Sequence, residues 1–122
     1  MILAVAMLTL ITISSVNVYY GYTNVTVIVN YELNDFQKLG VFLFGADQIE
    51  DDIIKLVNGT FEIEKVDVNH AILRFNVTDC GNYVYFQGVK LNREVDMRLV
   101  FRNNVTVYLN GTDEIPAVYM FK

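Results

Sequence analysis

The sequence predicts an α+β, β-rich fold, with a mainly antiparallel sheet or two-layer sandwich of about eight strands and one amphipathic helix over residues 47–57. Three observations predict it. Apolar and polar residues alternate along much of the chain, as in strands with one covered face. A single segment repeats its apolar residues with a helical period. Hydrophobic residues make up 53% of the 122 positions, enough for one packed core.

Residues 24–33 contain the clearest strand pattern. Val25, Val27 and Val29 fall on one face, and polar side chains fall on the other. Asn34-Asp35 then supplies residues that favour a turn. The run Val-Phe-Leu-Phe within residues 38–45 does not alternate, which is typical of an interior strand covered on both faces.

The helix is predicted from both its ends and its apolar stripe. Asp47 can cap the first turn, with Glu50 closing a capping box, and Asn58-Gly59 is a stop signal. With the flanking strands, the second at residues 61–68, the helix would form a crossover unit against the sheet. The stripe consists of Ile49, Ile53, Leu56 and Val57.

The rest of the chain is predicted to be strand. Asn110-Gly111 is expected to turn a hairpin, and Pro116 precedes the last strand. No internal repeat interrupts this order, so residues 21–122 are expected to form a single domain. The remaining strands are expected at residues 71–77, 83–91, 94–101, 105–109 and 117–121.

Residues 1–20 are expected to form an apolar leader, because no charged residue precedes Glu32. Three interpretations stay open. Residues 2–13 have the length of a signal-peptide core, although no basic residue precedes them. A run extended through Val18 would just span a bilayer and place Tyr19 and Tyr20 at its surface. Alternatively, residues 8–20 form a buried strand of the fold.

Five N-x-T sequons, where about one is expected by chance, indicate an exported chain at the cell surface or outside the cell. Six threonines follow Ser15, and five of them close a sequon. A plainer explanation is that strands favour Val and Thr, and that turns favour Asn-Gly. The candidate glycosylation sites are Asn24, Asn58, Asn76, Asn104 and Asn110.

Charge and cysteine content exclude several classes of protein. The formal net charge is −5 and the nine basic residues are scattered, so we expect no nucleic-acid partner. Cys80 is the one cysteine, so the chain forms no internal disulfide. Cys80 is expected to be either a small buried apolar residue or an exposed thiol without a role.

Side chains with catalytic or metal-binding chemistry do not form a recognisable motif, so no cofactor, metal or catalysis is expected. The carboxylates of Asp47, Glu50, Asp51 and Asp52 suit the positive end of a helix better than a cation. His70 is the one histidine and falls at a predicted turn.

Sixteen Tyr and Phe residues, with no Trp, would mostly pack the core, but some have the spacing of a binding face. Tyr83 and Tyr85 share a strand face and are the candidates for an exposed aromatic patch. Tyr108 and Tyr119 are further aromatic residues that could contribute to a binding platform.

These observations favour an exported or membrane-tethered cell-envelope domain that acts as a non-catalytic binding or structural module. Its partner would be another envelope protein or a second copy, and residues 1–20 would meet the membrane if they are retained. The order of parts is similar in outline to archaeal pilin-like and motility-accessory envelope proteins, but the peptidase site and early acidic residue of such pilins are missing. That outline gives a second hypothesis, a subunit of a surface filament or layer. The third is a small enzyme, which would need Asp67, His70 and Cys80 to converge.

Overall fold

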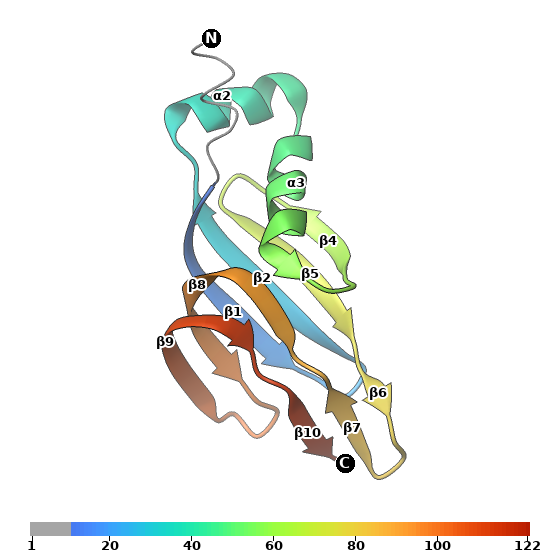
Figure 1. Ribbon diagram of the computed structural model, residues 1–122. Helices are drawn as coiled ribbons and strands as arrows, with labels where there is room; N and C mark the ends of the chain where they lie inside the picture. The colour runs from blue at the N-terminus through green and yellow to red at the C-terminus, as the bar shows by residue number, and fades with distance from the viewer. Residues whose placement is uncertain (1–10) are drawn as a thin grey trace.

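The computed structural model describes residues 11–122, which form two sheets and two helices (Figure 1). The predicted β-rich α+β class is confirmed. The helices are α2 (Asp35–Phe44) and α3 (Asp47–Leu56). The larger sheet contains β1 (Thr12–Tyr20), β2 (Asn24–Glu32), β3 (Val57–Asn58), β4 (Glu62–Val66), β5 (His70–Asn76), β8 (Val89–Val100) and β9 (Thr106–Ile115). The small sheet contains β6 (Thr78–Asp79), β7 (Tyr83–Phe86) and β10 (Val118–Phe121).

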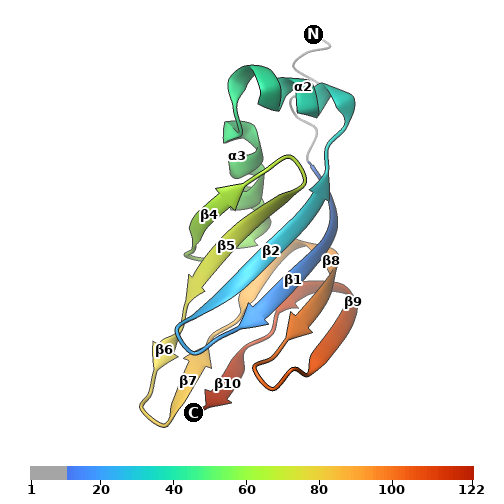
Figure 2. The same cartoon turned by 180° about the vertical axis from the view of Figure 1, so that it is seen from behind.

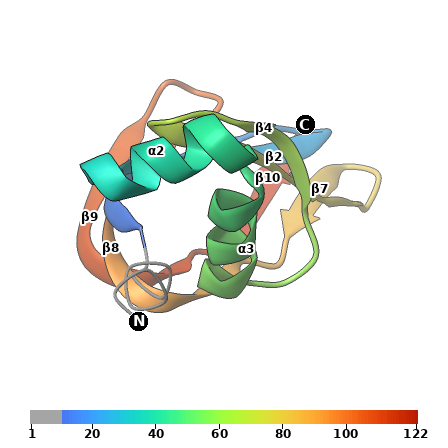
Figure 3. The ribbon, with the colours of Figure 1, turned by 90° about the horizontal axis from the view of Figure 1, so that it is seen from above.

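The larger sheet curls strongly, as seen from behind in Figure 2. Its order is β4-β5-β2-β1-β8, and β8 also pairs with β3 and β9. The described strands pair antiparallel except β1 and β8, which run parallel with Val16 opposite Met97. Viewed from above, the strands curl around a common centre and the two helices lie over one end (Figure 3). We call that the helical end, and the end with β6, β7 and β10 the distal end.

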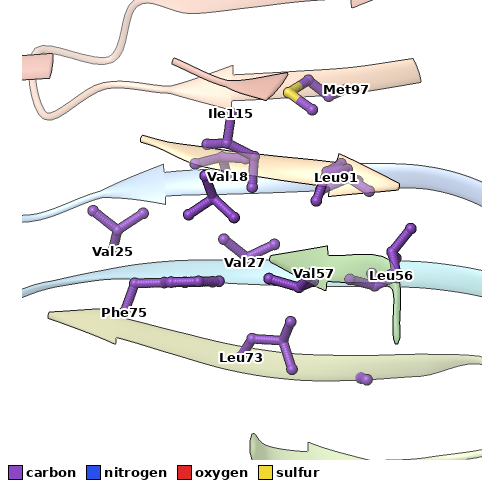
Figure 4. Packing of buried hydrophobic residues seen from close by; sticks show 14 of the residues in the cluster. Val18, Val25, Val27, Leu56, Val57, Leu73, Phe75, Leu91, Met97 and Ile115 are labelled. Atoms are coloured by element: carbon purple, nitrogen blue, oxygen red, sulfur yellow. The ribbon is translucent and has the colours of Figure 1, made fainter. Parts of the chain in front are cut away.

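The core lies on the inner side of this curl. Along β2, and along β1 from Val16 onward, every second residue is buried, as the sequence pattern predicts for residues 24–33. Figure 4 shows Val18, Val25 and Val27 packed with side chains from β3, β5, β8 and the end of β9. Helix α3 adds Ile49, Ile53 and Leu56 to this core, each at most 3% exposed. Burying each such side chain contributes roughly 1.5–3 kcal/mol.

Residues 12–20 of the predicted leader belong to the fold, as strand β1. Strand β1 lies between β2 and β8, and Val16 and Val18 are at most 1% exposed. Val16 and Val18 are apolar because they face the protein core, so strand β1 belongs to the fold and not to a bilayer-spanning segment. Residues 1–10, the remainder of the predicted leader, lie outside the described residues.

The prediction of an interior strand within residues 38–45 is wrong, because residues 38–44 belong to helix α2 and Gly45 is its C-cap. Asn34 caps this helix: its side chain accepts from the Gln37 backbone, and the Gln37 side chain accepts from the Asn34 backbone. This capping box fixes the helical start that the apolar run obscures. The predicted strand–helix–strand crossover is therefore also wrong.

Two turn predictions also need correction. No side chain caps α3, whose N-cap is Ala46, so the predicted Asp47–Glu50 capping box is wrong. Asn110-Gly111 does not turn a hairpin. It forms a bulge within β9, where Gly111 has a φ of 62° and its N–H donates to Asp96. The hairpin instead closes at residues 101–105, through the Phe101 N–H and the Val105 carbonyl.

Gly88 carries the chain from the small sheet to the larger one, and its replacement should be costly. Its φ is 82°, and an added Cβ would lie 2.8 Å from the Ile115 carbonyl oxygen. We expect Gly88→Ala to lower the free energy of unfolding by at least about 2 kcal/mol. Gly40 in α2 has open space around it, so Gly40→Ala should raise that free energy by about 0.5–1 kcal/mol. Urea unfolding of both variants tests this, and equal stabilities would contradict it.

Candidate functional site

The outer face of the small sheet carries four aromatic rings, which we call the aromatic face: Tyr83 and Tyr85 of β7, and Tyr119 and Phe121 of β10. The two strands pair antiparallel, with Tyr119 opposite Tyr85 and Phe121 opposite Tyr83. Ring centroids lie 4.7 Å apart for Tyr85–Tyr119 and 5.7 Å apart for Tyr83–Phe121.

Strand alternation creates this face. The intervening Val84, Phe86 and Met120 are buried, so their neighbours point outward. Tyr119 is 62% exposed and Phe121 is 73% exposed, whereas Tyr83 and Tyr85 are half-buried. The sequence indicates Tyr83 and Tyr85 but not their pairing with β10, because strand order is not visible in a pattern. Tyr108 lies on β9, away from Tyr119.

A groove of about 410 Å³ adjoins the aromatic face and shares Tyr119 and Phe121 with it. The Arg102 guanidinium lies 4.1 Å from the centre of the Tyr22 ring, a cation–π geometry. The Tyr22 hydroxyl donates to the Phe121 carbonyl at 2.8 Å, which ties the β1–β2 turn to the last strand. The lining residues are Tyr22, Phe101, Arg102, Asn103, Val118, Tyr119, Met120 and Phe121.

Polar groups beside the aromatic face hold it in place. Lys122 Nζ lies 3.0 Å from Asp79 Oδ1, which links the last residue of the chain to β6. The Gly81 N–H and the Lys122 ammonium both donate to Asp79 and lower the pKa of its carboxyl. A hydrogen bond with Cys80 raises the pKa of the Tyr83 hydroxyl, so this ring is neutral at pH 7. Its rings and hydroxyl groups suit the face to apolar and hydrogen-bonding contacts.

The five candidate glycosylation sites all lie on the surface. Asn58, Asn76, Asn104 and Asn110 are exposed, and Asn24 is half-buried. Asn24 and Asn76 are direct partners across β2 and β5. Asn104 has a φ of 66°, a conformation that Asn tolerates in tight turns.

The structure does not bring together the three residues that a small enzyme would need. Asp67 and His70 flank the β4–β5 turn, where the Asp67 N–H donates to the His70 carbonyl. His70 Nδ1 lies 2.6 Å from Asn69 Oδ1. Cys80 is exposed in the β6–β7 turn at the distal end, far from the β4–β5 turn (Figure 2).

The acidic residues of α3 differ in their surroundings. Asp47 and Asp51 are exposed, whereas Asp52 is 7% exposed. Burial raises the pKa of the Asp52 carboxyl, and a hydrogen bond from the Ile11 backbone opposes that rise. The helical period distinguishes Asp52 from its neighbours, since it lies next to Ile53 and three residues from Ile49 on the covered side. Within residues 11–122, no three His, Cys, Asp or Glu side chains gather closely enough to hold a metal ion.

Tyr31 should make stability sensitive to alkaline pH. Its hydroxyl donates to the Asp67 and His70 carbonyls, and burial raises its pKa from 10.0 to about 12. The folded state therefore retains a proton that the unfolded chain loses, so this stabilisation is complete below pH 10 and is lost as the pH rises from 10 to 12. We expect Tyr31→Phe to be about 1 kcal/mol less stable at pH 8 but to lose less stability above pH 10.

Urea unfolding from pH 8 to pH 11.5 tests this, with Tyr108→Phe as the control because Tyr108 is 71% exposed. Parallel losses of stability above pH 10 in Tyr31→Phe and the parent would contradict the assignment.

No protein-family model, curated protein or solved structure matches this chain. Neither of the helices in residues 11–122 has the length and apolar character needed to cross a bilayer.

Proposed function

We propose that this chain is an exported or membrane-tethered domain of the cell envelope that binds a partner through its aromatic face and groove, without catalysis. The observation that carries the proposal is the separation of these features along the molecule. Strand β1 begins at the helical end, whereas the aromatic face and the C-terminus lie at the distal end (Figure 1). An apolar segment before β1 would hold the helical end at the membrane and present the distal end outward.

The surface positions of the sequons support export. A glycan must extend into solvent, and none of the five asparagines is buried. Asn104 and Asn110 also belong to the β8–β9 hairpin, where β9 is an edge strand. A bulky sugar beside such an edge would oppose pairing with another chain.

The aromatic face suits a protein partner, either another envelope protein or a second copy. Tyrosine is enriched at protein interfaces because it combines a large apolar ring with a hydrogen-bonding hydroxyl. Arg102 beside the groove adds a cation whose ring contact orients it. Such a site recognises apolar and acceptor groups together.

The test is an intact-mass measurement of the protein from its native source, together with fractionation of that source. We expect the protein in the membrane or extracellular fraction, with sugar mass added to the 14.0 kDa of the chain. Replacing Asn76 or Asn104 by Gln should each remove one sugar mass, whereas Asn69→Gln, outside any sequon, should remove none. An unmodified protein in the cytoplasmic fraction would defeat the proposal.

A second candidate function, a subunit of a surface filament or layer, is favoured by strand β9. It pairs only with β8 among the described strands, and three apolar residues at or just before its start are 37–71% exposed: Val105, Val107 and Tyr108. An apolar edge of this kind can accept a strand from a neighbouring chain. Sedimentation distinguishes the two functions: a subunit forms large assemblies that Val107→Lys abolishes, whereas a binding module forms no large assembly and Val107→Lys leaves its sedimentation unchanged.

A further inference from the structure

Helix α2 turns large apolar side chains toward solvent. No residue of this helix is buried. We call four of its exposed apolar residues, which share one side of the helix, the outer face of α2: Phe36 (41% exposed), Leu39 (53%), Phe42 (85%) and Leu43 (57%). Scattered exposed apolar residues are ordinary, but four on one side of a ten-residue helix form a patch of the kind that marks an interaction surface.

The opposite side of α2 holds the helix on the protein through a narrow contact. Gln37 and Val41, four residues apart, line a small gap together with Ile11, Leu33 and Ile49. Leu39, Phe42 and Leu43 are spaced by three or four residues and so share the side that faces away from this contact. The helix is thus more apolar on its outer side than where it meets the domain, the reverse of an ordinary surface helix.

Position links the outer face to the rest of the chain. Helix α2 lies across the helical end, as seen from the side and from above (Figures 1 and 3). Ile11, where the described chain begins, lines the same small gap as Val41 of α2. The ten preceding residues contain no charged side chain. The proposed tether and the outer face of α2 therefore belong to one end of the molecule.

We propose that the outer face of α2 docks on the surface of a lipid bilayer, beside the point where the apolar tether enters it. The inference rests on the tether of the proposed function. Ile11, the first described residue, lines the same small gap as Val41 of α2, so a tether that precedes it would hold α2 close to the bilayer surface. A helix lying in the interface buries its apolar side at the boundary between headgroups and acyl chains.

Charge favours a zwitterionic bilayer over an anionic one. Helix α2 contains one acid, Asp35, and one base, Lys38. The neighbouring α3 adds Asp47, Glu50 and Asp51 near the same end, and the whole chain carries −5. No basic cluster is present in these helices to recognise anionic lipid. Docking should therefore depend on apolar burial and vary little with salt.

The absence of tryptophan from the chain makes a direct test possible. Phe42→Trp in the full chain places one fluorophore on the outer face of α2, and Tyr119→Trp places one at the distal end. With phosphatidylcholine vesicles, we expect the emission of the F42W variant to shift to shorter wavelength and to be quenched by lipids brominated on their acyl chains. The Y119W emission should change in neither respect.

Three results would overturn the proposal. If vesicles bind the F42W variant without changing its emission, the tether binds the bilayer but α2 does not dock on it. If the emission is already blue-shifted without lipid and ignores vesicles, protein covers the outer face, either residues 1–10 or a second copy. If F42W responds only to vesicles containing phosphatidylglycerol, the commitment to a zwitterionic surface is wrong. Sugar content and cellular location, which test the proposed function, are measured independently of all three.

A matched pair of variants gives a second measurement. Leu43 and Ile54 are 57% and 56% exposed, but Ile54 lies on α3. We expect Leu43→Gln to weaken partition into phosphatidylcholine vesicles by about tenfold and Ile54→Gln by less than about twofold. Equal losses in the two variants would show that general surface hydrophobicity, rather than α2, drives binding.

Discussion

A chain that begins at Gly21 is expected to lose cooperative folding altogether. Such a chain lacks β1, which pairs with β2 on one side and β8 on the other. It would also lose the buried side chains of Val16, Val18 and Tyr20. Exposing two new strand edges and the facing core removes more than the roughly 5–15 kcal/mol that stabilises a typical domain. Circular dichroism during thermal unfolding should show no transition.

The control for this truncation is a chain that begins at Ile11. It keeps every described strand pairing. It also keeps the Ile11 carbonyl, which accepts a hydrogen bond from the Arg93 side chain at 3.0 Å. We expect it to unfold cooperatively. A cooperative transition in the chain that begins at Gly21 would mean that the leader does extend to residue 20, and that β1 is dispensable.

Phe86→Ala is expected to give the largest loss of stability among single substitutions in the small sheet. Phe86 is 1% exposed, and its ring lies edge-on to Tyr20 at 5.9 Å and to Phe75 at 6.2 Å. It therefore joins the small sheet to β1 and β5. Truncation should lower the free energy of unfolding by about 3–5 kcal/mol, because a buried ring leaves a cavity that its neighbours fill only in part.

Phe121→Ala is the matched control, since Phe121 belongs to the same small sheet but is 73% exposed. Urea unfolding should show a change within about 0.5 kcal/mol for this variant. If both phenylalanine variants lose similar stability, the small sheet is not held through Phe86, and the assignment of its inner and outer faces is wrong.

The sequence predicts the strands well where one face is covered and the other is not. Val25, Val27 and Val29 alternate with polar residues, and β2 follows that pattern residue by residue. The same reasoning fails for α2, because its outer face carries apolar side chains in solvent and so resembles a run covered on both sides. The capping box of Asn34 and Gln37 is the signal that marks this helix.

Other failures come from information that is not local. An apolar strand is hard to distinguish from a membrane segment by sequence when its place in the sheet depends on a distant strand. Strand β1 pairs with β2 and with the distant β8, where Val16 lies opposite Met97. The sequence predicts two of the four residues of the aromatic face. Tyr83 and Tyr85 follow from their spacing on one strand, whereas their neighbours Tyr119 and Phe121 depend on the pairing of β7 with β10.

The parallel pairing of β1 with β8 sets the order in which the chain can fold. Val16 of β1 lies opposite Met97 of β8, so one edge of β1 stays unpaired until most of the polypeptide has been synthesised. Closing such a long loop is slow, and domains rich in distant contacts fold in milliseconds to seconds. The nascent chain therefore keeps an open sheet, with one edge of β1 accessible, until β8 has been synthesised.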